Sequence, residues 1–208
     1  FQPNNNLAVS REYRIYFSGI KDLFDNVMYS TSSDFTTSFE DDVTAPEVTK
    51  ISIPDNAVDV PLNPVLRVQF SEPVNSLTLS GIKLLLSDGT VVAVQSRELL
   101  SDNVTVQLNL PTNQLLLANN SYQLVIADVE DLAGQKIAEV QSTFTTGAES
   151  DTTRGTILNW SFASNVDLPL NPLLEVEFSE RVDITTVSTN YGGTFYLYNY
   201  TQSRAVLG

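Results

Sequence analysis

One stretch of sequence occurs twice in this chain, and this duplication limits the possible folds more than any other feature. The segment DVPLNPVLRVQFSEPV at 59–74 is matched by DLPLNPLLEVEFSERV at 167–182, so that Asn63 corresponds to Asn171. A second pair of segments, YRIYFSGIKDLFDN from Tyr13 and YQLVIADVEDLAGQ from Tyr122, recurs with almost the same spacing. A period of about a hundred residues indicates tandem domains, each of them one copy of a repeated unit.

Alternating apolar residues indicate β-strands in every copy. The segment LRVQF at 66–70 alternates apolar with polar residues, and LEVEF at 174–178 keeps the apolar face while the solvent face changes. Two prolines predict a loop over 56–64, and Asp88-Gly89 predicts a tight hairpin with a return strand over 91–99. We count seven strands in the complete unit and no helical periodicity. The sequence therefore predicts an all-β fold of tandem immunoglobulin-like β-sandwiches, one complete and two partial.

The repeat also predicts where the domains begin and end. Linkers rich in acids and proline stay extended, so we expect neighbouring domains to stand in line. Half a sandwich cannot bury its sheet face. Either the chain continues beyond both ends, or one copy completes the partial domain of another. The boundaries are 1–39 for the back of one domain, 40–46 for an acidic linker, 47–147 for the complete domain, 148–155 for a second linker and 156–208 for the front of a further domain.

Five motifs together carry a resemblance to a known family. The motifs PDNAVDVPLNP (54–64), VQFSEPV (68–74), Y-x-L-x-I from Tyr122, DLAG (131–134) and STFTT (142–146) resemble the bacterial Ig-like domain of S-layer proteins and large repetitive adhesins. The resemblance extends over the middle unit and both partial ones. It implies a spacer or lattice-forming module at a bacterial or archaeal cell surface, and similar domains also accompany secreted polysaccharide hydrolases.

The charge of the chain excludes several classes of partner. The net charge is −14 and only 11 Lys and Arg are spread along the sequence, which argues against binding to nucleic acid or to anionic membrane surfaces. No apolar run approaches the length of about 18 residues that a membrane-spanning helix needs, so we expect no membrane insertion.

Catalysis has little support in the sequence. The chain has no His and no Cys, so the usual general base and thiol nucleophile are absent. Glu72 in the motif F-S-E recurs as Glu180, and a residue present in each copy is best interpreted as part of the scaffold. We therefore expect no enzymatic activity.

Calcium is the better chemical hypothesis, because acidic side chains in turns and linkers supply the oxygen ligands that this ion prefers. No EF-hand spacing is present, and solvated surface acids are the alternative interpretation. The candidate ligands are Glu40, Asp41, Asp42, Asp128, Glu130, Asp131 and Asp151.

Aromatic residues suggest one structural device and one contact surface. Tyr13 and Tyr122 begin equivalent strands and predict tyrosine corners, in which the hydroxyl bonds to upstream backbone. In the segment TFYLYNY, alternation places Phe195 and Leu197 in the core and predicts an exposed row that could contact a sugar or a protein. That row consists of Tyr196, Tyr198 and Tyr200.

These features predict a structural segment of an extracellular surface protein. Tandem modules would form a fibre, stalk or S-layer-type lattice through contacts with copies of the same chain or with neighbouring Ig-like domains. The alternatives are an adhesin module that binds glycan or host protein, and an accessory module of a secreted polysaccharide hydrolase.

Overall fold

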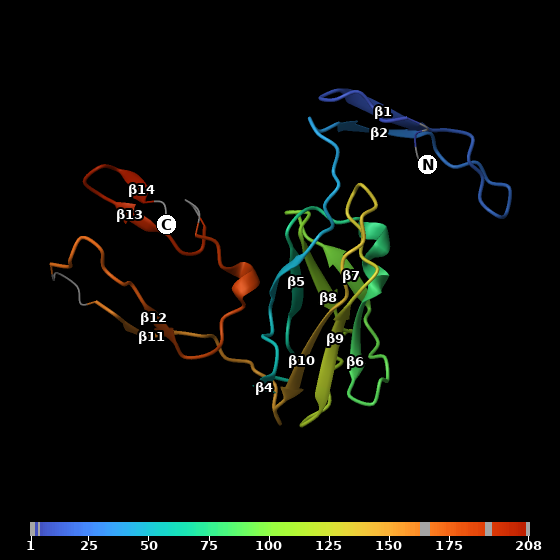
Figure 1. Cartoon of the computed structure of the whole chain (residues 1–208). Coiled ribbons are helices and arrows are strands. Elements are labelled where there is room, and N and C mark those ends of the chain that lie inside the picture. The colour runs from blue at the N-terminus through green and yellow to red at the C-terminus, as the bar shows by residue number, and fades with distance from the viewer. Residues whose placement is uncertain (1–2, 4, 163–166, 190–192, 207–208) are drawn as a thin grey trace. The chain divides into compact units, whose positions relative to one another are not determined.

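The computed structural model describes residues 3, 5–162, 167–189 and 193–206, and it divides into two units, Phe1–Thr44 and Ala45–Gly208 (Figure 1). The first unit contains one antiparallel pair of strands, β1 (Glu12–Phe17) and β2 (Thr31–Thr36). The second unit contains the complete domain, whose strands are β3 (Val48–Ile51), β4 (Ala57–Val60), β5 (Leu66–Phe70), β6 (Ile82–Leu86), β7 (Ser96–Leu99), β8 (Thr105–Asn109), β9 (Ser121–Ile126) and β10 (Val140–Thr146). It continues with β11 (Ile157–Trp160), β12 (Val176–Phe178), β13 (Leu197–Asn199) and β14 (Arg204–Val206). Two short 3-10 helices, η1 (Ser76–Gly81) and η2 (Ile184–Thr186), precede β6 and β13.

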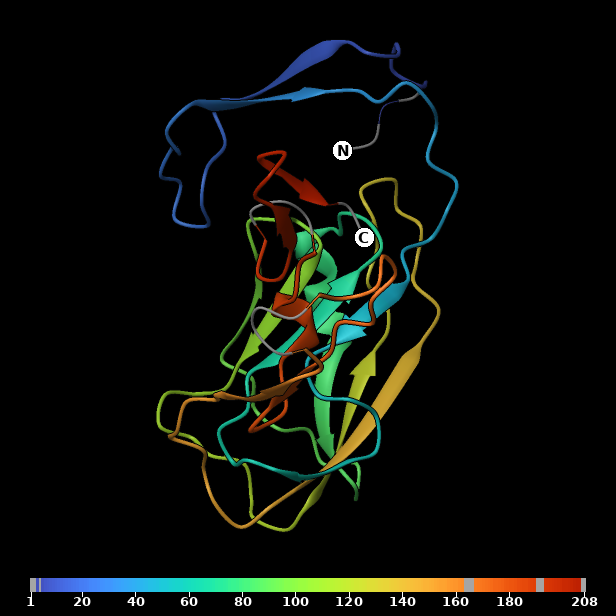
Figure 2. The ribbon, with the colours of Figure 1, turned by 90° about the vertical axis from the view of Figure 1, so that its left-hand side faces the viewer.

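The complete domain is a β-sandwich, as predicted, but each of its two sheets has four strands, which makes eight strands where the sequence predicted seven. One sheet has the strand order β4-β10-β9-β6 and the other β3-β5-β8-β7. Figure 2 shows the chain turned by 90° from the view of Figure 1. The predicted inward faces form the core between the sheets, where Val68, Ile82, Leu84, Val106 and Ile126 have no exposed surface. Because these side chains come from strands of both sheets, their burial joins the two layers.

Two local predictions about the strands were wrong. The predicted loop at 56–64 contains β4, which lies parallel to β10: the Asn56 N–H donates to the Thr143 carbonyl (2.7 Å) and the Gly147 N–H to the Val60 carbonyl (2.9 Å). The chain therefore leaves one sheet after β3 and joins the other before Pro61 ends the strand.

The return strand after the predicted hairpin also changes sheets. Gly89 supplies the positive φ of +86° and Val91 pairs with Leu85 through an isolated bridge. The chain then crosses to the opposite sheet and pairs as β7 with β8. A period of two residues does not show to which sheet a strand belongs, so the sequence could not reveal either crossover.

The structure confirms that the duplicated segments occupy equivalent positions. In the middle domain Val48 pairs with Phe70, and in the third segment Ile157 pairs with Phe178. The hydroxyl of Ser52 bridges Val65 and Arg67 of the neighbouring strand, and Ser161 makes the same bridge at the equivalent place in the third segment. The strand register and the serine hydrogen bonds are the same in the two copies, so the two copies have the same local structure here.

The predicted tyrosine corners are confirmed in both copies. The Tyr122 hydroxyl accepts from the Leu117 N–H at 2.7 Å, and the Tyr13 hydroxyl accepts from the Ala8 N–H at 2.9 Å. Each tyrosine also stacks on the phenylalanine that pairs with it across the sheet, with ring centroids 5.4 Å apart for Tyr122–Phe144 and 5.7 Å for Tyr13–Phe35. Among the described residues, no helix has the length and apolar character needed to cross a membrane.

Candidate functional site

The turn after β9 holds a carboxylate in an unusual environment. Asp131 is 1% exposed, and its Oδ1 accepts from the backbone N–H groups of Ala133 (2.7 Å) and Gln135 (2.8 Å). Its Oδ2 is buried and, within the described part of the chain, has no hydrogen-bond partner. Buried polar atoms are nearly always hydrogen-bonded, because removal from water without a partner is costly. This oxygen therefore marks a place where a partner belongs.

The F-S-E-P-V segment brings a second acid to this turn. Val74 forms a β-bridge with Asp131, and the Asn75 N–H donates to the Glu130 carbonyl at 2.7 Å. These backbone contacts place Glu72 beside the turn, with one carboxylate oxygen within 4.8 Å of an oxygen of Asp131. Two negative carboxylates at this separation repel each other unless a cation or a proton lies between them.

The chain enters the domain next to the same acid. The Glu47 N–H donates to the Ser71 hydroxyl at 3.0 Å, and the Ser71 N–H donates to the Glu47 carbonyl at 2.9 Å. The linker aspartate Asp42 precedes Glu47 by five positions, and its Oδ1 accepts from the N–H (3.1 Å) and hydroxyl (3.0 Å) of Thr44. Glu47 thus attaches the entering chain to Ser71, which directly precedes Glu72.

The second linker repeats this arrangement. The Thr156 N–H donates to the Ser179 hydroxyl at 2.8 Å, and the Oδ1 of Asp151 accepts from the N–H and hydroxyl of Thr153, both at 2.8 Å. Asp151 and Thr153 are the repeat equivalents of Asp42 and Thr44, so the motif D-x-T occurs in both linkers.

In the second linker the aspartate lies against the glutamate of F-S-E. Hydrogen bonds from Thr153 hold the pKa of Asp151 below its usual range. The pKa of Glu180 is raised, first by its hydrogen bond with Asp151 and then by desolvation and by the charge of Asp151. The glutamate of F-S-E is therefore a partner of the linker aspartate in this copy, and the sequence interpretation of it as plain scaffold missed this role.

The other predicted calcium ligands have partners within the chain, and two of them lie near a lysine side chain. Asp128 and Glu130 approach the Lys136 ammonium at 3.3 Å and 4.0 Å. Both oxygens of Asp41 accept from the Asn6 amide, at 3.1 Å and 3.2 Å, and the carbonyl of Glu40 accepts from Ser38. These four acids stay predictions as calcium ligands, while the backbone brings Asp131 together with Glu72, which the sequence prediction did not include.

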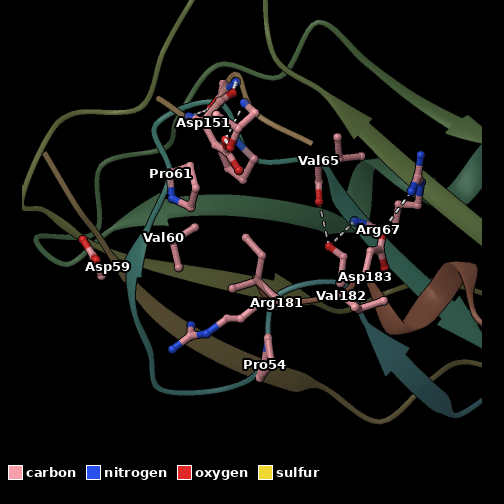
Figure 3. Close-up of a pocket in the computed structure, with 15 residues that line it drawn as sticks. Pro54, Asp59, Val60, Pro61, Val65, Arg67, Asp151, Arg181, Val182 and Asp183 are labelled. Atoms are coloured by element: carbon pink, nitrogen blue, oxygen red, sulfur yellow. Dashed lines mark hydrogen bonds and ion pairs between the residues drawn. The ribbon is translucent and has the colours of Figure 1, made fainter. Parts of the chain in front are cut away.

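A groove of about 380 Å³ lies where the second linker passes the repeated P-L-N-P loop (Figure 3). The Asn63 amide donates to the Asp151 carbonyl at 2.7 Å, and the Asp151 N–H donates back to the Asn63 side chain at 2.9 Å. The Leu62 N–H adds a bond of 3.0 Å to the Glu149 carbonyl. The repeated asparagine thus binds the linker backbone, a role that its position in a proline-rich loop did not reveal.

On the other side of this groove an ion pair joins the complete domain to the segment that follows it. A guanidinium N–H of Arg67 donates to Asp183 at 2.7 Å (Figure 3). A second one donates to the Gln107 side chain at 2.9 Å. The Lys50 ammonium donates to the Val187 carbonyl at 3.2 Å. The outward residues of β3 and β5 therefore bind the next segment.

The predicted tyrosine row is only partly exposed. Tyr196 and Tyr200 are 44% and 88% exposed, while Tyr198 is half-buried and its ring lies edge-on to Tyr200 at 5.1 Å. Phe195 and Leu197, predicted to be in the core, are 51% and 50% exposed. The strand reaches only from Leu197 to Asn199 and pairs with β14 alone. Without a facing sheet in the described part of this segment, alternation does not produce an inside and an outside.

The third segment also carries an apolar groove of about 860 Å³. Its lining includes Trp160, Val176 and Phe178, which correspond to Ile51, Val68 and Phe70 of the middle domain. Val68 and Phe70 are buried in the core of the middle domain, whereas Trp160 and Phe178 are 50% and 45% exposed. The groove is thus the core face of a half-sandwich.

Comparisons with known proteins identify the family of the complete domain. The sequence profile described as "Bacterial Ig-like domain" matches residues 42–146. A search of curated proteins finds no match. Solved structures with similarity include CopC from Methylosinus trichosporium OB3b, at 18% identity and a TM-score of 0.41, covering 52% of this chain and 99% of that one. They also include domains 1–6 of the surface layer protein SbsC, at 15% identity and a TM-score of 0.39, covering 79% of this chain and 22% of that one.

Proposed function

Because the chain belongs to the family of bacterial Ig-like domains, we propose that it is a structural, non-catalytic segment of an extracellular surface protein, in which tandem modules form a stalk, fibre or lattice. The observation that supports this function best is the bonding of the second linker to the P-L-N-P loop. A linker held by three hydrogen bonds transmits orientation from one module to the next, which a free linker does not. The P-L-N-P loop recurs in the third segment, which supports an equivalent contact between loop and linker at each junction.

The location is tested on the cells that produce the protein. Antibodies raised against the 208-residue chain should label the outer surface of intact cells in immunogold electron microscopy, and pre-immune serum should not. Label confined to the cell interior would contradict a surface role.

The two hydrogen bonds between Asn63 and Asp151, which we call the linker clamp, give a testable prediction. In Asn63→Ala both bonds to Asp151 are lost. Since each hydrogen bond contributes about 1 kcal/mol, the loss is about 2 kcal/mol, and local opening should become about thirty-fold more frequent. Hydrogen exchange at the amide of Asp151 should accelerate by that factor. Asn171→Ala, the same change in the other copy, is the matched control and should leave this amide unchanged. Equal exchange in both variants and in the wild type would rule out the clamp.

The exposed tyrosines favour a second candidate, an adhesin module that binds glycan. Aromatic rings stack on the apolar faces of sugars, and Tyr200 is 88% exposed. If this candidate is correct, the chain should bind at least one glycan on an array, and Tyr200→Ala should reduce that binding about ten-fold, as expected for the loss of about 1.4 kcal/mol of stacking. Tyr29→Ala, which removes a tyrosine 99% exposed in the first unit, is the control. An array without bound chain would dismiss the candidate.

A further inference from the structure

The outer face of the sheet β3-β5-β8-β7 carries a charged contact with the third segment. The Arg67 guanidinium donates to Asp183 at 2.7 Å (Figure 3). It also donates to the Gln107 side chain at 2.9 Å, and the Gln107 amide donates in turn to the Asn109 side chain at 2.8 Å. The side chains of Arg67 and Asp183 are each 24% exposed, so water and salt screen this pair less than they screen a fully exposed one.

Asp183 is held in place by the turn to which it belongs. It caps η2, and its Oδ1 accepts from the N–H (2.9 Å) and the hydroxyl (2.6 Å) of Thr185, while its Oδ2 accepts from Arg67. The Lys50 ammonium donates to the Val187 carbonyl at the end of the same turn, at 3.2 Å. Because the aspartate and the arginine are each held by other bonds, their pairing orders little additional side chain, and such ordering is a main cost of surface ion pairs.

The repeat shows that the cap is common to the copies and that its charge is not. Position 183 corresponds to Asn75 of the middle domain, which caps η1 in the same way and accepts from the Leu77 N–H at 3.0 Å. Position 67 corresponds to Glu175 of the third segment. The two copies thus differ in charge at both positions that meet in the ion pair, although each copy forms the same capped turn. The local structure of a module does not require these charges, so they serve the junction between modules.

The third segment has an outer face of the opposite sign at the equivalent place. Glu175 and Glu177 are both exposed, on either side of Val176. Together with Asn159 they line a groove of about 380 Å³. The corresponding residues of the middle domain are Lys50, Arg67 and Gln69. Since like charges brought together at an interface exclude a partner, this acidic face would reject an acidic cap and attract a basic one.

We propose that the residue at the position of Arg67, together with the cap of the next module's 3-10 helix, determines which module can follow which. The complete domain accepts a module whose 3-10 helix is capped by an acid, as that of the third segment is by Asp183. The third segment, with Glu175 at the equivalent position, accepts a module that carries Lys or Arg at this cap. The inference rests on the proposed role as a tandem structural module, and it adds a rule for the order of the modules.

Energy transfer within the full chain measures whether the third segment is docked on the outer face of the complete domain. The chain has one tryptophan, Trp160 in the third segment, and no cysteine. Lys83→Cys, at an exposed position of β6, therefore gives a single site for a fluorescent acceptor. Time-resolved transfer from Trp160 should give one narrow distance distribution for the docked segment and a broad one for the released segment. A broad distribution in the labelled chain without further substitutions would overturn the proposal.

Exchange of the two charges tests the rule, with the label at the same place in every variant. Arg67→Glu gives the middle domain the acid that the third segment has, and the released fraction should rise at least about ten-fold, because two acids then face each other. Asp183→Lys should also release the segment, because two cations then face each other. In the double variant Arg67→Glu/Asp183→Lys, the released fraction should be at least about five-fold lower than in either single variant, since the pair is restored with its charges exchanged.

Two further variants separate the ion pair from other effects. Asp183→Asn keeps a side chain that can cap the turn, as Asn75 does in η1, so it should raise the released fraction through the loss of charge alone. Lys136→Glu changes the net charge as Arg67→Glu does, at a residue whose ion pairs lie within the complete domain, and should leave docking unchanged.

The effect of salt should have opposite signs in the two states of the pair. Raising NaCl from about 0.05 M to about 1 M should release the segment in the wild type, where salt screens an attraction, and favour docking in Arg67→Glu, where it screens a repulsion. Unchanged docking in Arg67→Glu, or no recovery in the double variant, would overturn the rule. These measurements use the purified chain and not its location on cells, so the rule and the surface role can fail independently.

Discussion

Gly81→Ala is expected to destabilise the complete domain by about 3 kcal/mol, at the upper end of the cost of overpacking a core. Gly81 ends η1 and lies against the backbone after β9, where an added Cβ would come within 1.8 Å of the Ala127 carbonyl oxygen and 2.9 Å of its carbon. The Ala127 N–H also donates to the Gly81 carbonyl at 3.2 Å. Neither backbone can move away without breaking the pairing of β6 with β9. Urea unfolding followed by circular dichroism measures the loss.

Gly89→Ala is the matched control for this variant. Gly89 has a φ of +86°, and a Cβ there would meet nothing within 4 Å. Its replacement by alanine costs only the strain of an L-residue in the left-handed conformation, about 1–2 kcal/mol. If Gly81→Ala cost no more than Gly89→Ala, the close approach of the two backbones would be wrong.

Leu84→Ala is the second variant with a large expected effect, a loss of about 3 kcal/mol from the free energy of unfolding, because removing a buried leucine costs its transfer energy and leaves a cavity. Leu84 has no exposed surface and lies at the centre of β6, paired with Leu124 of β9. The same urea titration measures the change, and the m-value should stay constant.

An exposed leucine provides the comparison. Leu77 on η1 is 89% exposed, so Leu77→Ala should change stability by less than about 0.5 kcal/mol. Equal effects of the two substitutions would contradict the assignment of β6 to the centre of the core.

Much of the fold could be predicted because the decisive signals are local and occur more than once. The alternation at 66–70 identified a face that is buried in the structure, and Tyr122 identified the corner that bonds to Leu117. The β4 strand was missed because it pairs through a few backbone bonds at a sheet edge, and such pairing leaves little trace in side-chain pattern.

The candidate site was predictable only in part. Asp131 was named as a ligand from acid clustering, but its neighbour Glu72 was interpreted as scaffold because it recurs. Recurrence signals a shared role without specifying which one, and the contact between these residues arises from the long-range backbone pairing of Val74 with Asp131. Likewise, only the fold shows that Asn63 reaches Asp151, which lies 88 residues away.

The parallel pairing of β4 with β10 determines how the domain would respond to tension. The chain enters the domain just before β3 and β4 and leaves it directly after β10, so a pull on the two ends draws β4 and β10 in opposite directions along their length. Their hydrogen bonds are then loaded in shear and have to break together, whereas an antiparallel hairpin pulled from its open end would unzip one bond at a time. The pairing of β4 with β10, which the sequence did not predict, would thus provide the main resistance of the module to unfolding under force.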